Sequence, residues 1–222
     1  MIQFENITVQ TQNYLILDNV SFEIAHKEKA VFFGPSGSGK TTILMTLIGA
    51  VVPSNGMVRF DGELLTAQSL PQLRQAIAFI GQEPVMGAPG VRESLLLPFS
   101  FKANHTRLPS EDRIQQVLDE LMLPPAILNK QTAILSGGEK QRLAVARALL
   151  LKKTVFVLDE VTSALDPQSR RAVLSRFHQP EITLLSVSHD PEWLTLCTRF
   201  FKVEKGRVTT QNTAPILKET PQ

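Results

Sequence analysis

A glycine-rich stretch near the start of the chain carries the residue types that bind phosphate groups. It reads GPSGSGKTT and lies between the apolar run AVFF and the helix-forming run TTILMTLIG. Glycines let backbone N–H groups converge on phosphate oxygens, Lys40 reaches the β and γ phosphates, and the Thr41 hydroxyl can ligate Mg²⁺. A purely structural glycine turn needs neither the lysine nor these flanks. We therefore predict a nucleotide-binding loop made of Gly34, Pro35, Ser36, Gly37, Ser38, Gly39, Lys40, Thr41 and Thr42.

Two adjacent acids follow a buried-strand pattern further along the chain. In TVFVLDE, four apolar residues are followed directly by Asp159 and Glu160. Ligands of open α/β sheets bind at the carboxyl ends of the strands, which is where both acids would emerge. Asp159 is then placed to hold Mg²⁺, and Glu160 to orient or deprotonate an attacking water. Two acids after a strand could equally be solvated surface groups, and it is the glycine-rich loop that favours the catalytic interpretation.

A third stretch predicts a second phosphate-binding element and so raises a question. In ILSGGEKQRLAVARALL, the turn Ser136-Gly137-Gly138 leads directly into a strong helix-forming run. Backbone N–H groups and the helix dipole favour anions at such a helix start. One nucleotide does not obviously need two such elements from the same subunit.

The hydrophobic pattern indicates the elements that must position these residues. Alternation with a period of two in IQFENITV and VSFEI, and a short strand in NGMVRFDG, predict a partly antiparallel sheet in the first third of the chain. Runs that are apolar on both faces predict a buried parallel sheet, and they are AVFF, AIAFI, TVFVL and ITLLSVS. Between Gln82 and Lys153 the strand pattern stops. This segment instead holds two predicted helices, SEDRIQQVLDELM with Ser110 as its N-cap and EKQRLAVARALLLKK.

We interpret residues 1–222 as a single α/β domain. Residues 1–82 and 153–222 form the core with its β subdomain, and residues 83–152 form an inserted helical subdomain. The polar end of the chain, TTQNTAPILKETPQ, is expected to fray.

Composition describes an ordinary globular chain and argues against several function classes. The 222 residues are 43% hydrophobic and 20% charged, and 23 basic against 21 acidic residues give a net charge of +2. This balance gives no reason to expect nucleic acid as a partner. The single cysteine, Cys197, is expected to be a small buried hydrophobe, as suits a reducing compartment. No signal-peptide pattern opens the chain, and no apolar window approaches the ~20 residues that span a bilayer.

Together these motifs identify a family that the chain resembles. LSGGEKQR, placed between the glycine-rich loop and TVFVLDE, is similar to the signature of the nucleotide-binding subunits of ATP-binding cassette (ABC) transporters. The likeness covers essentially the whole chain, and the fifth signature residue is Glu139 where glutamine is commoner. The matching motifs are the P-loop (Gly34–Thr41), the Q-loop glutamine (Gln82), the signature (Leu135–Glu139), the Walker B pair (Asp159 and Glu160), the D-loop (Ser163–Asp166) and the switch histidine (His189).

The resemblance implies a fold and an activity. The fold would be a P-loop NTPase (RecA-like) core with an N-terminal antiparallel β subdomain and an inserted α-helical subdomain. The chain would bind and hydrolyse ATP with Mg²⁺. The implied catalytic residues are Lys40, Gln82, Glu160 and His189, although a lone histidine after a strand is often only a polar cap. The implied metal ligands are Thr41, Gln82 and Asp159.

The resemblance also answers the question of the two phosphate-binding elements. Cassettes of this family pair head to tail, so the signature of one subunit closes over the ATP that the P-loop of the other subunit holds. The residues that would act across this homodimer interface are Ser136, Gly137, Gly138 and Glu139. ATP would then join the subunits, and hydrolysis would remove the bridging γ-phosphate.

The adenine contact departs from the family pattern. Family members usually stack adenine on an aromatic residue in the N-terminal strand region, and that position falls near Thr11 or Gln12 here. Tyr14 lies two or three residues later. Either the loop bends to bring Tyr14 to the adenine, or Tyr14 is an ordinary packing residue.

Partners and cargo follow from the same resemblance. The membrane part of the transporter would be a separate permease, docked around Gln82 to Phe101, and the chain would work at the cytoplasmic face of the cell membrane. The segments GVRESLLLPF and LPPAILNKQTAILSGGEKQR look similar to those of the bacterial iron-export ABC ATPase of the Fet type. The alternative is a non-transport ABC ATPase that acts as a soluble interaction module. A small-molecule P-loop kinase would have no use for LSGGE or SALD.

Overall fold

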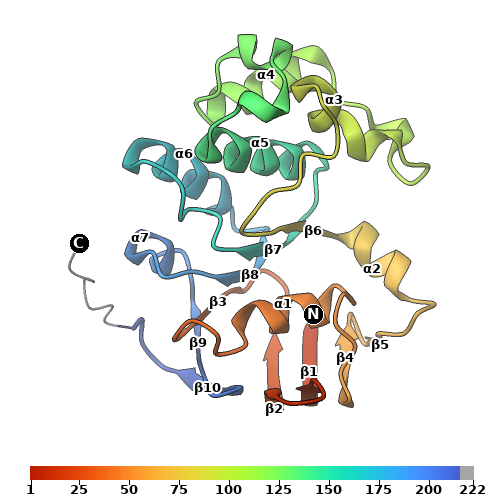
Figure 1. The fold of residues 1–222 in the computed structure, drawn as a ribbon, viewed down its shortest axis with the longest axis vertical. Coiled ribbons are helices and arrows are strands. Elements are labelled where there is room, and N and C mark those ends of the chain that lie inside the picture. The colour runs from red at the N-terminus through yellow and green to blue at the C-terminus, as the bar shows by residue number, and fades with distance from the viewer. Residues whose placement is uncertain (216–222) are drawn as a thin grey trace.

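The computed structural model describes residues 1–215, and a six-stranded sheet forms its centre (Figure 1). In spatial order the strands are β10 (Arg207–Gln211), β9 (Arg199–Glu204), β3 (Lys29–Phe33), β8 (Thr183–Val187), β7 (Val155–Asp159) and β6 (Ile77–Ile80). All neighbours are parallel except β10, which pairs antiparallel with β9 at the edge. Every residue of β7 and β8 is buried, because helices and the second sheet cover both faces.

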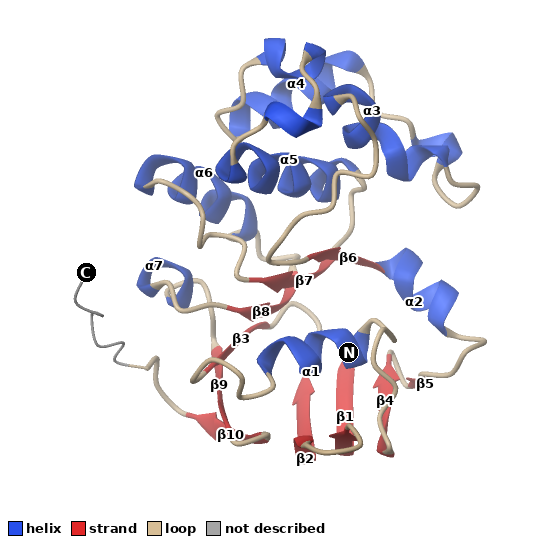
Figure 2. Cartoon of the chain, in the orientation of Figure 1, coloured by secondary structure: helices blue, strands red, loops and turns tan. Residues whose placement is uncertain are grey.

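A second, antiparallel sheet packs below the first in Figure 2. Its order is β2 (Leu15–Ile24), β1 (Ile2–Gln10), β4 (Asn55–Phe60) and β5 (Glu63–Leu64). Buried and exposed residues alternate in much of β1 and β2, which is the pattern of strands that face a core on one side only. The strands predicted in the first third of the chain are therefore confirmed.

The helices fall into two groups. Those outside the predicted insertion are α1 (Lys40–Leu47), α2 (Leu70–Ala76), α6 (Pro167–Phe177) and α7 (Pro191–Leu194). The rest lie together at the top of Figure 1 and are α3 (Val91–Leu96), α4 (Glu111–Glu120) and α5 (Gly137–Leu150), with short 3₁₀ turns at Leu97–Ser100, His105–Arg107, Pro125–Asn129 and Thr132–Ile134. Ser110 caps α4 by accepting the Arg113 N–H, as predicted. None of the helices in residues 1–215 is long and apolar enough to cross a membrane.

The apolar core divides along the two faces of the central sheet. Alternate strand residues such as Phe32 and Val157 face the antiparallel sheet and α1, and they form one cluster. The other face, with Phe156, joins α5 and continues through Leu143 to Val117 of α4. Residues 83–152 thus share their core with the sheet, and their assignment as a separate subdomain stays a prediction.

The expectation for the end of the chain was wrong in part. Thr209–Gln211 belong to β10 and pair with Phe200–Lys202 of β9, while residues 216–222 lie outside the described part of the chain. A two-residue turn joins the strands, with positive φ at Lys205 (49°) and Gly206 (75°). The sequence RFFKVE reads poorly as a buried strand because it carries charges at Arg199, Lys202 and Glu204, which lie at half-buried or exposed positions although β9 pairs with a strand on each side.

Candidate functional site

The P-loop is folded tightly against two strands. Gly34 has φ 145°, and a Cβ atom there would lie 2.0 Å from the Val203 carbonyl oxygen of β9. Gly39 has φ 105°, and its Cβ would lie 3.0 Å from the Ile16 carbonyl oxygen of β2. Because only glycine fits either position, the loop backbone can form the close turn that places its N–H groups around an anion. No side chain caps α1 at Gly39, which leaves the first N–H groups of the helix for a ligand.

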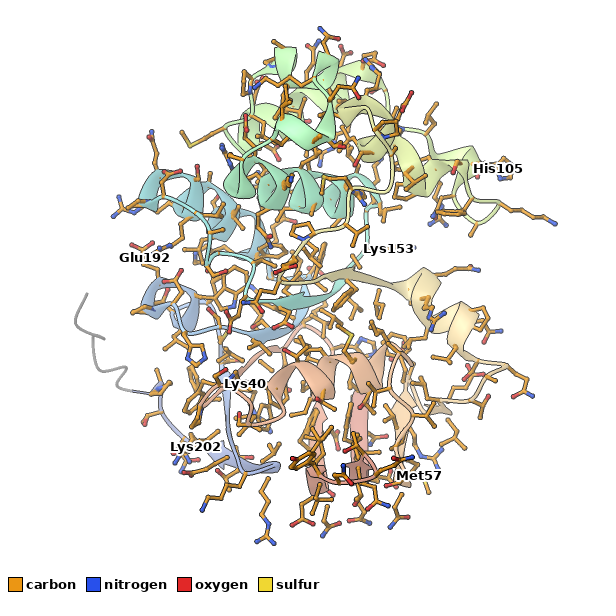
Figure 3. All side chains as sticks on the ribbon, in the orientation of Figure 1. Lys40, Met57, His105, Lys153, Glu192 and Lys202 are labelled. Carbon is orange, nitrogen blue, oxygen red and sulfur yellow. The ribbon has the colours of Figure 1, made fainter. Side chains whose placement is uncertain are left out.

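Lys40 lies across this loop at the start of α1 (Figure 3). Its Nζ donates to the carbonyl oxygens of Gly34 and Pro35, each at 2.8 Å. Burial lowers the pKa of Lys40, and the nearby Glu160 and Asp159 carboxylates oppose that shift. The loop therefore holds a desolvated ammonium group where phosphate charge would compensate it.

Asp159 ends β7 and is buried beside the P-loop. Its Oδ2 accepts a hydrogen bond of 2.8 Å from the Thr41 hydroxyl, although the two residues are 118 positions apart in sequence. Burial raises the pKa of Asp159, and the Thr41 hydrogen bond acts in the opposite direction. The structure thus brings two of the predicted metal ligands into contact.

Glu160 turns its side chain into the cleft by an unusual backbone conformation. Its φ is 46°, in the left-handed region that non-glycine residues rarely occupy, and its N–H donates to the Val187 carbonyl oxygen. Such local strain is typical of functional sites. Glu160 Oε2 accepts from Gln82 Nε2 at 3.2 Å, and Oε1 lies 3.9 Å from His189 Nε2.

His189 follows β8 and faces the same cleft. Burial lowers its pKa first, and the positive charge of Lys40 adds to that effect, while Glu160 opposes it. A lowered pKa favours the neutral imidazole at pH 7, which has one N–H donor and one acceptor nitrogen. His189 can therefore donate a hydrogen bond to a phosphate oxygen.

Lys40, Thr41, Glu160 and His189 line one open cleft of about 450 Å³, whereas Asp159 lies outside its wall. Its walls are Ile16, Ser36, Gly37, Gly39, Lys40, Thr41, Thr42, Gln82, Glu160 and His189. Every wall residue except Ile16 was named from the sequence. The cleft lies at the carboxyl ends of β3, β7 and β8, as expected for an open α/β sheet.

Tyr14 is not part of the cleft wall. Its side chain is 74% exposed, and the turn is closed by hydrogen bonds between Tyr14 and Thr11. Ile16, two residues later at the start of β2, lines the cleft instead. The stacking role of Tyr14 stays a prediction, and the wall residue from this part of the chain is the aliphatic Ile16 rather than Thr11, Gln12 or Tyr14.

The signature residues lie outside this cleft. Ser136 caps α5 by accepting the Glu139 N–H at 3.2 Å, and the Glu139 carboxylate accepts the Ser136 N–H at 2.8 Å. The backbone hydrogen bond from Ser136 lowers the pKa of Glu139. A Cβ atom at Gly137 would meet nothing within 4 Å, so this helix start faces open space.

The β9–β10 turn is a positioning element that the sequence reasoning missed. The Gly206 N–H donates to the Ser38 carbonyl oxygen at 3.2 Å, and this hydrogen bond ties the turn to the P-loop backbone. The local signal was the Lys205-Gly206 pair between two short runs of strand-forming residues. Nothing in that signal indicates contact with the P-loop.

The fold and the cleft define a P-loop NTPase, with a phosphate-binding loop, a carboxylate pair and a histidine on one sheet edge. A family model described as ABC transporter matches residues 17–163. The chain is 32% identical over 196 residues to the probable iron export ATP-binding protein FetA of Escherichia coli strain K12, covering 86% of each chain. It is 33% identical over 207 residues to the energy-coupling factor transporter ATP-binding protein EcfA1 of Geobacillus kaustophilus, covering 91% of this chain and 74% of that one.

A solved structure gives the same result. A dimeric post-hydrolysis state of the ATP-binding cassette MJ0796, bound to ADP and Pi, has a TM-score of 0.84 and 26% identity, covering 96% of this chain and 98% of that chain. The chain belongs to the ABC transporter family as an ATP-binding subunit, and it is an ATPase.

Proposed function

We propose that this chain is the ATP-hydrolysing motor of an ABC transporter, in which two copies pair head to tail and drive a separate membrane permease. ATP would lie between the P-loop of one copy and the signature turn of the other. The permease would hold the motor at the cytoplasmic face of the cell membrane.

The observation that carries this proposal is the separation of the two phosphate-binding elements. The cleft around Lys40 contains a P-loop, Glu160 and His189 but none of the residues from Ser136 to Glu139. The signature turn is already hydrogen-bonded as a capping box and faces open space at Gly137. A helix start that is already ordered and faces open space at Gly137 would be complementary to a phosphate that another subunit presents.

Within the cleft, the residues fit the hydrolysis of a bound nucleoside triphosphate. Glu160 would accept a proton from a water that attacks the γ-phosphorus, as the bond to the ADP oxygen breaks. Lys40 and His189 would stabilise the charge on the γ-phosphate oxygens. The lowered pKa of His189 supports a neutral donor in this role.

Thr41 and Asp159 fit Mg²⁺, because hard cations prefer hydroxyl and carboxylate oxygens. Gln82 donates its amide N–H to Glu160, which leaves its amide oxygen as a further ligand. No group of three or more His, Cys, Asp or Glu side chains in residues 1–215 could hold a metal by itself. Mg²⁺ at this site would therefore also need phosphate oxygens as ligands. Its chemistry would be to neutralise the phosphate charge.

Mixing two inactive variants tests the head-to-tail arrangement. Lys40→Ala removes the charge on the P-loop, and Gly137→Asp adds a carboxylate at a position with free space, so the subunit fold should be kept. In a mixed dimer, one composite site collects both defects, while the other combines an intact P-loop with an intact signature turn. We expect mixing to restore ATPase activity and ATP-dependent association of the two labelled variants. Neither rescue nor association, with both variants folded, would show that Ser136–Glu139 do not act across an interface.

The predicted permease site is supported by an apolar cleft on another face. A cavity of about 350 Å³ is lined by residues that include Phe79, Pro84, Val85 and Ala144, and Val85 is 80% exposed. Exposed apolar surface of this kind is typical of partner-binding sites. Val85→Asp should abolish co-purification with the permease and leave the ATPase activity of the isolated subunit unchanged. Retained co-purification would place the permease elsewhere.

For the cargo we propose a metal ion, iron in particular, moved outward. This rests on likeness to the probable iron export protein of Escherichia coli. Relatives named as putative peptide import proteins have the same identity of 32%, so the likeness supports the motor more strongly than the cargo. Cells without the gene should accumulate iron under iron excess, and wild-type protein but not Glu160→Gln should reverse this. Unchanged cellular iron would remove the cargo and leave the motor proposal intact.

A further inference from the structure

A second cavity borders two of the proposed catalytic residues, Glu160 and His189. It measures about 260 Å³ and shares Glu160 and His189 with the nucleotide cleft. Its other walls come from the segment after Glu160, from α6 and from the residues that follow β8. Two oppositely charged side chains, Arg170 and Asp190, line this cavity, and both lie outside the sequence motifs of the family.

Arg170 and Asp190 form a partly buried ion pair. Arg170 Nε lies 3.2 Å from Asp190 Oδ2, and the Asp190 side chain is only 9% exposed. Neither of these two atoms has a hydrogen-bond partner within residues 1–215. Arg170, whose side chain is 30% exposed, is therefore the charge that compensates the burial of the Asp190 carboxylate, and its loss leaves that carboxylate unpaired.

Asp190 in turn fixes the backbone beside His189. Its Oδ1 accepts the Glu192 N–H at 3.0 Å and so caps α7, while its own N–H donates to the Ser188 hydroxyl at 3.1 Å. His189 thus lies between two residues that are held in place. The position of its ring in the cleft therefore depends on the position of this short segment.

The other arm of Arg170 reaches the turn that precedes α6. Its Nη2 donates to the Leu165 carbonyl oxygen at 3.4 Å. The start of α5 packs against the same turn, because a Cβ atom at Gly138 would lie 3.2 Å from the Ala164 carbonyl oxygen. One planar guanidinium therefore joins the His189 segment to the turn under the signature helix, which a point charge such as lysine cannot do equally well.

We propose that Arg170 is a positioning residue that holds His189 against the γ-phosphate by clamping Asp190 to the Leu165 turn. This inference rests on the proposed role of His189 in hydrolysis. Arg170 does not line the nucleotide cleft, so its effect on the reaction is through the placement of His189 rather than through contact with the nucleotide.

The neighbouring arginine provides a matched control. Arg171 lies on the same helix, is 73% exposed, and has Nε 3.6 Å from Glu192 Oε1 on α7. Figure 3 shows Glu192, a residue of α7, at the outer edge of the molecule. Arg171→Gln removes the same charge from the same helix without touching the clamp.

The test is a double-mutant cycle on ATP hydrolysis by the full chain. Arg170→Gln should lower kcat by about 3- to 30-fold, the range of coupling effects through packed networks, and leave the KM for ATP within about twofold. Arg171→Gln should leave both within about twofold. In a background of His189→Ala, adding Arg170→Gln should cause no further loss, because the residue to be positioned is gone.

Several results would overturn the inference. An unchanged kcat for Arg170→Gln would show that Arg170 does not position His189. An unchanged kcat for His189→Ala would show that His189 has no role in hydrolysis that positioning could support. Equal losses from Arg170→Gln with and without His189 show an independent, merely structural role. If Arg170→Gln does not fold, the cycle is run with Arg170→Lys, which keeps a charge opposite Asp190 but lacks the second arm, and the same outcomes decide. Absence of ATPase activity in the wild-type chain would instead reject the proposed function.

Discussion

Glu160→Gln separates the chemical step from binding and folding. The carboxylate is 25% exposed, accepts one hydrogen bond from Gln82 and lies 3.9 Å from His189. Glutamine keeps the length of the side chain, and its amide oxygen can still accept the Gln82 N–H. We therefore expect the free energy of unfolding to change by less than about 1 kcal/mol, as for partly exposed polar pairs.

The loss of rate follows from the loss of the proton acceptor. General-base catalysis contributes about 10²- to 10⁴-fold, which corresponds to about 3–5 kcal/mol of activation free energy. Because the phosphate-binding groups around Lys40 are unchanged, ATP affinity should stay within about threefold. A dimer with uncleaved ATP should then accumulate.

Three measurements check this prediction. Phosphate release gives kcat, a fluorescent ATP analogue gives affinity, and gel filtration with ATP and Mg²⁺ gives the oligomeric state. Glu181→Gln, at a carboxylate that is 66% exposed and pairs with Lys27, is the control and should behave as the wild type in all three. Turnover of Glu160→Gln at the wild-type rate would refute the assignment of Glu160.

Three further predictions concern burial and backbone geometry. Burial raises the pKa of Asp159, so its ionisation opposes folding as the pH rises through the folded pKa. Without nucleotide and with EDTA, Asp159→Asn should therefore raise Tm at pH 7 but not at pH 3. Equal Tm values for the variant and the wild type at pH 7 would contradict this. Gly34→Ala should abolish ATP binding, because its Cβ would overlap the Val203 carbonyl oxygen. The control is Gly62→Ala, where φ is 82° and a Cβ would meet nothing within 4 Å. That variant should lower the free energy of unfolding in chemical denaturation by only about 1 kcal/mol and keep ATP binding. Burial raises the pKa of Cys197 to about 12, so iodoacetamide at pH 8 should label this thiol only in denaturant. Rapid labelling of the folded protein would contradict the buried position of Cys197.

Most of the sheet could be predicted from the sequence, since buried parallel strands have a pattern that depends on their own residues. AVFF, TVFVL and ITLLSVS each overlap one strand of the central sheet. The strands β9 and β10 were missed, because both carry charged and polar side chains at their half-buried and exposed positions and so resemble loops. Their importance for the P-loop, through Gly206 and Val203, arises only when β9 pairs with β3.

The candidate site divides in the same way. Motif spacing identified Lys40, Glu160 and His189, because each follows a strand whose carboxyl end must lie at one edge of a parallel sheet. The adenine side could not be settled from spacing. Whether Tyr14 or Ile16 faces the cleft depends on how a hairpin turn bends, and the structure places Ile16 there.

By itself the sequence determined the chemistry of this protein: a phosphate-binding loop, a carboxylate pair, a histidine and a second anion-binding helix start, each encoded in a few consecutive residues. Tertiary structure alone decided which of these share a cleft and what holds them there. Thr41 meets Asp159 across 118 positions, and Arg170 joins Asp190 to Leu165, through contacts between segments distant in sequence. Local patterns report the neighbours along the chain, whereas such contacts depend on strand order and on the packing of helices against the sheet.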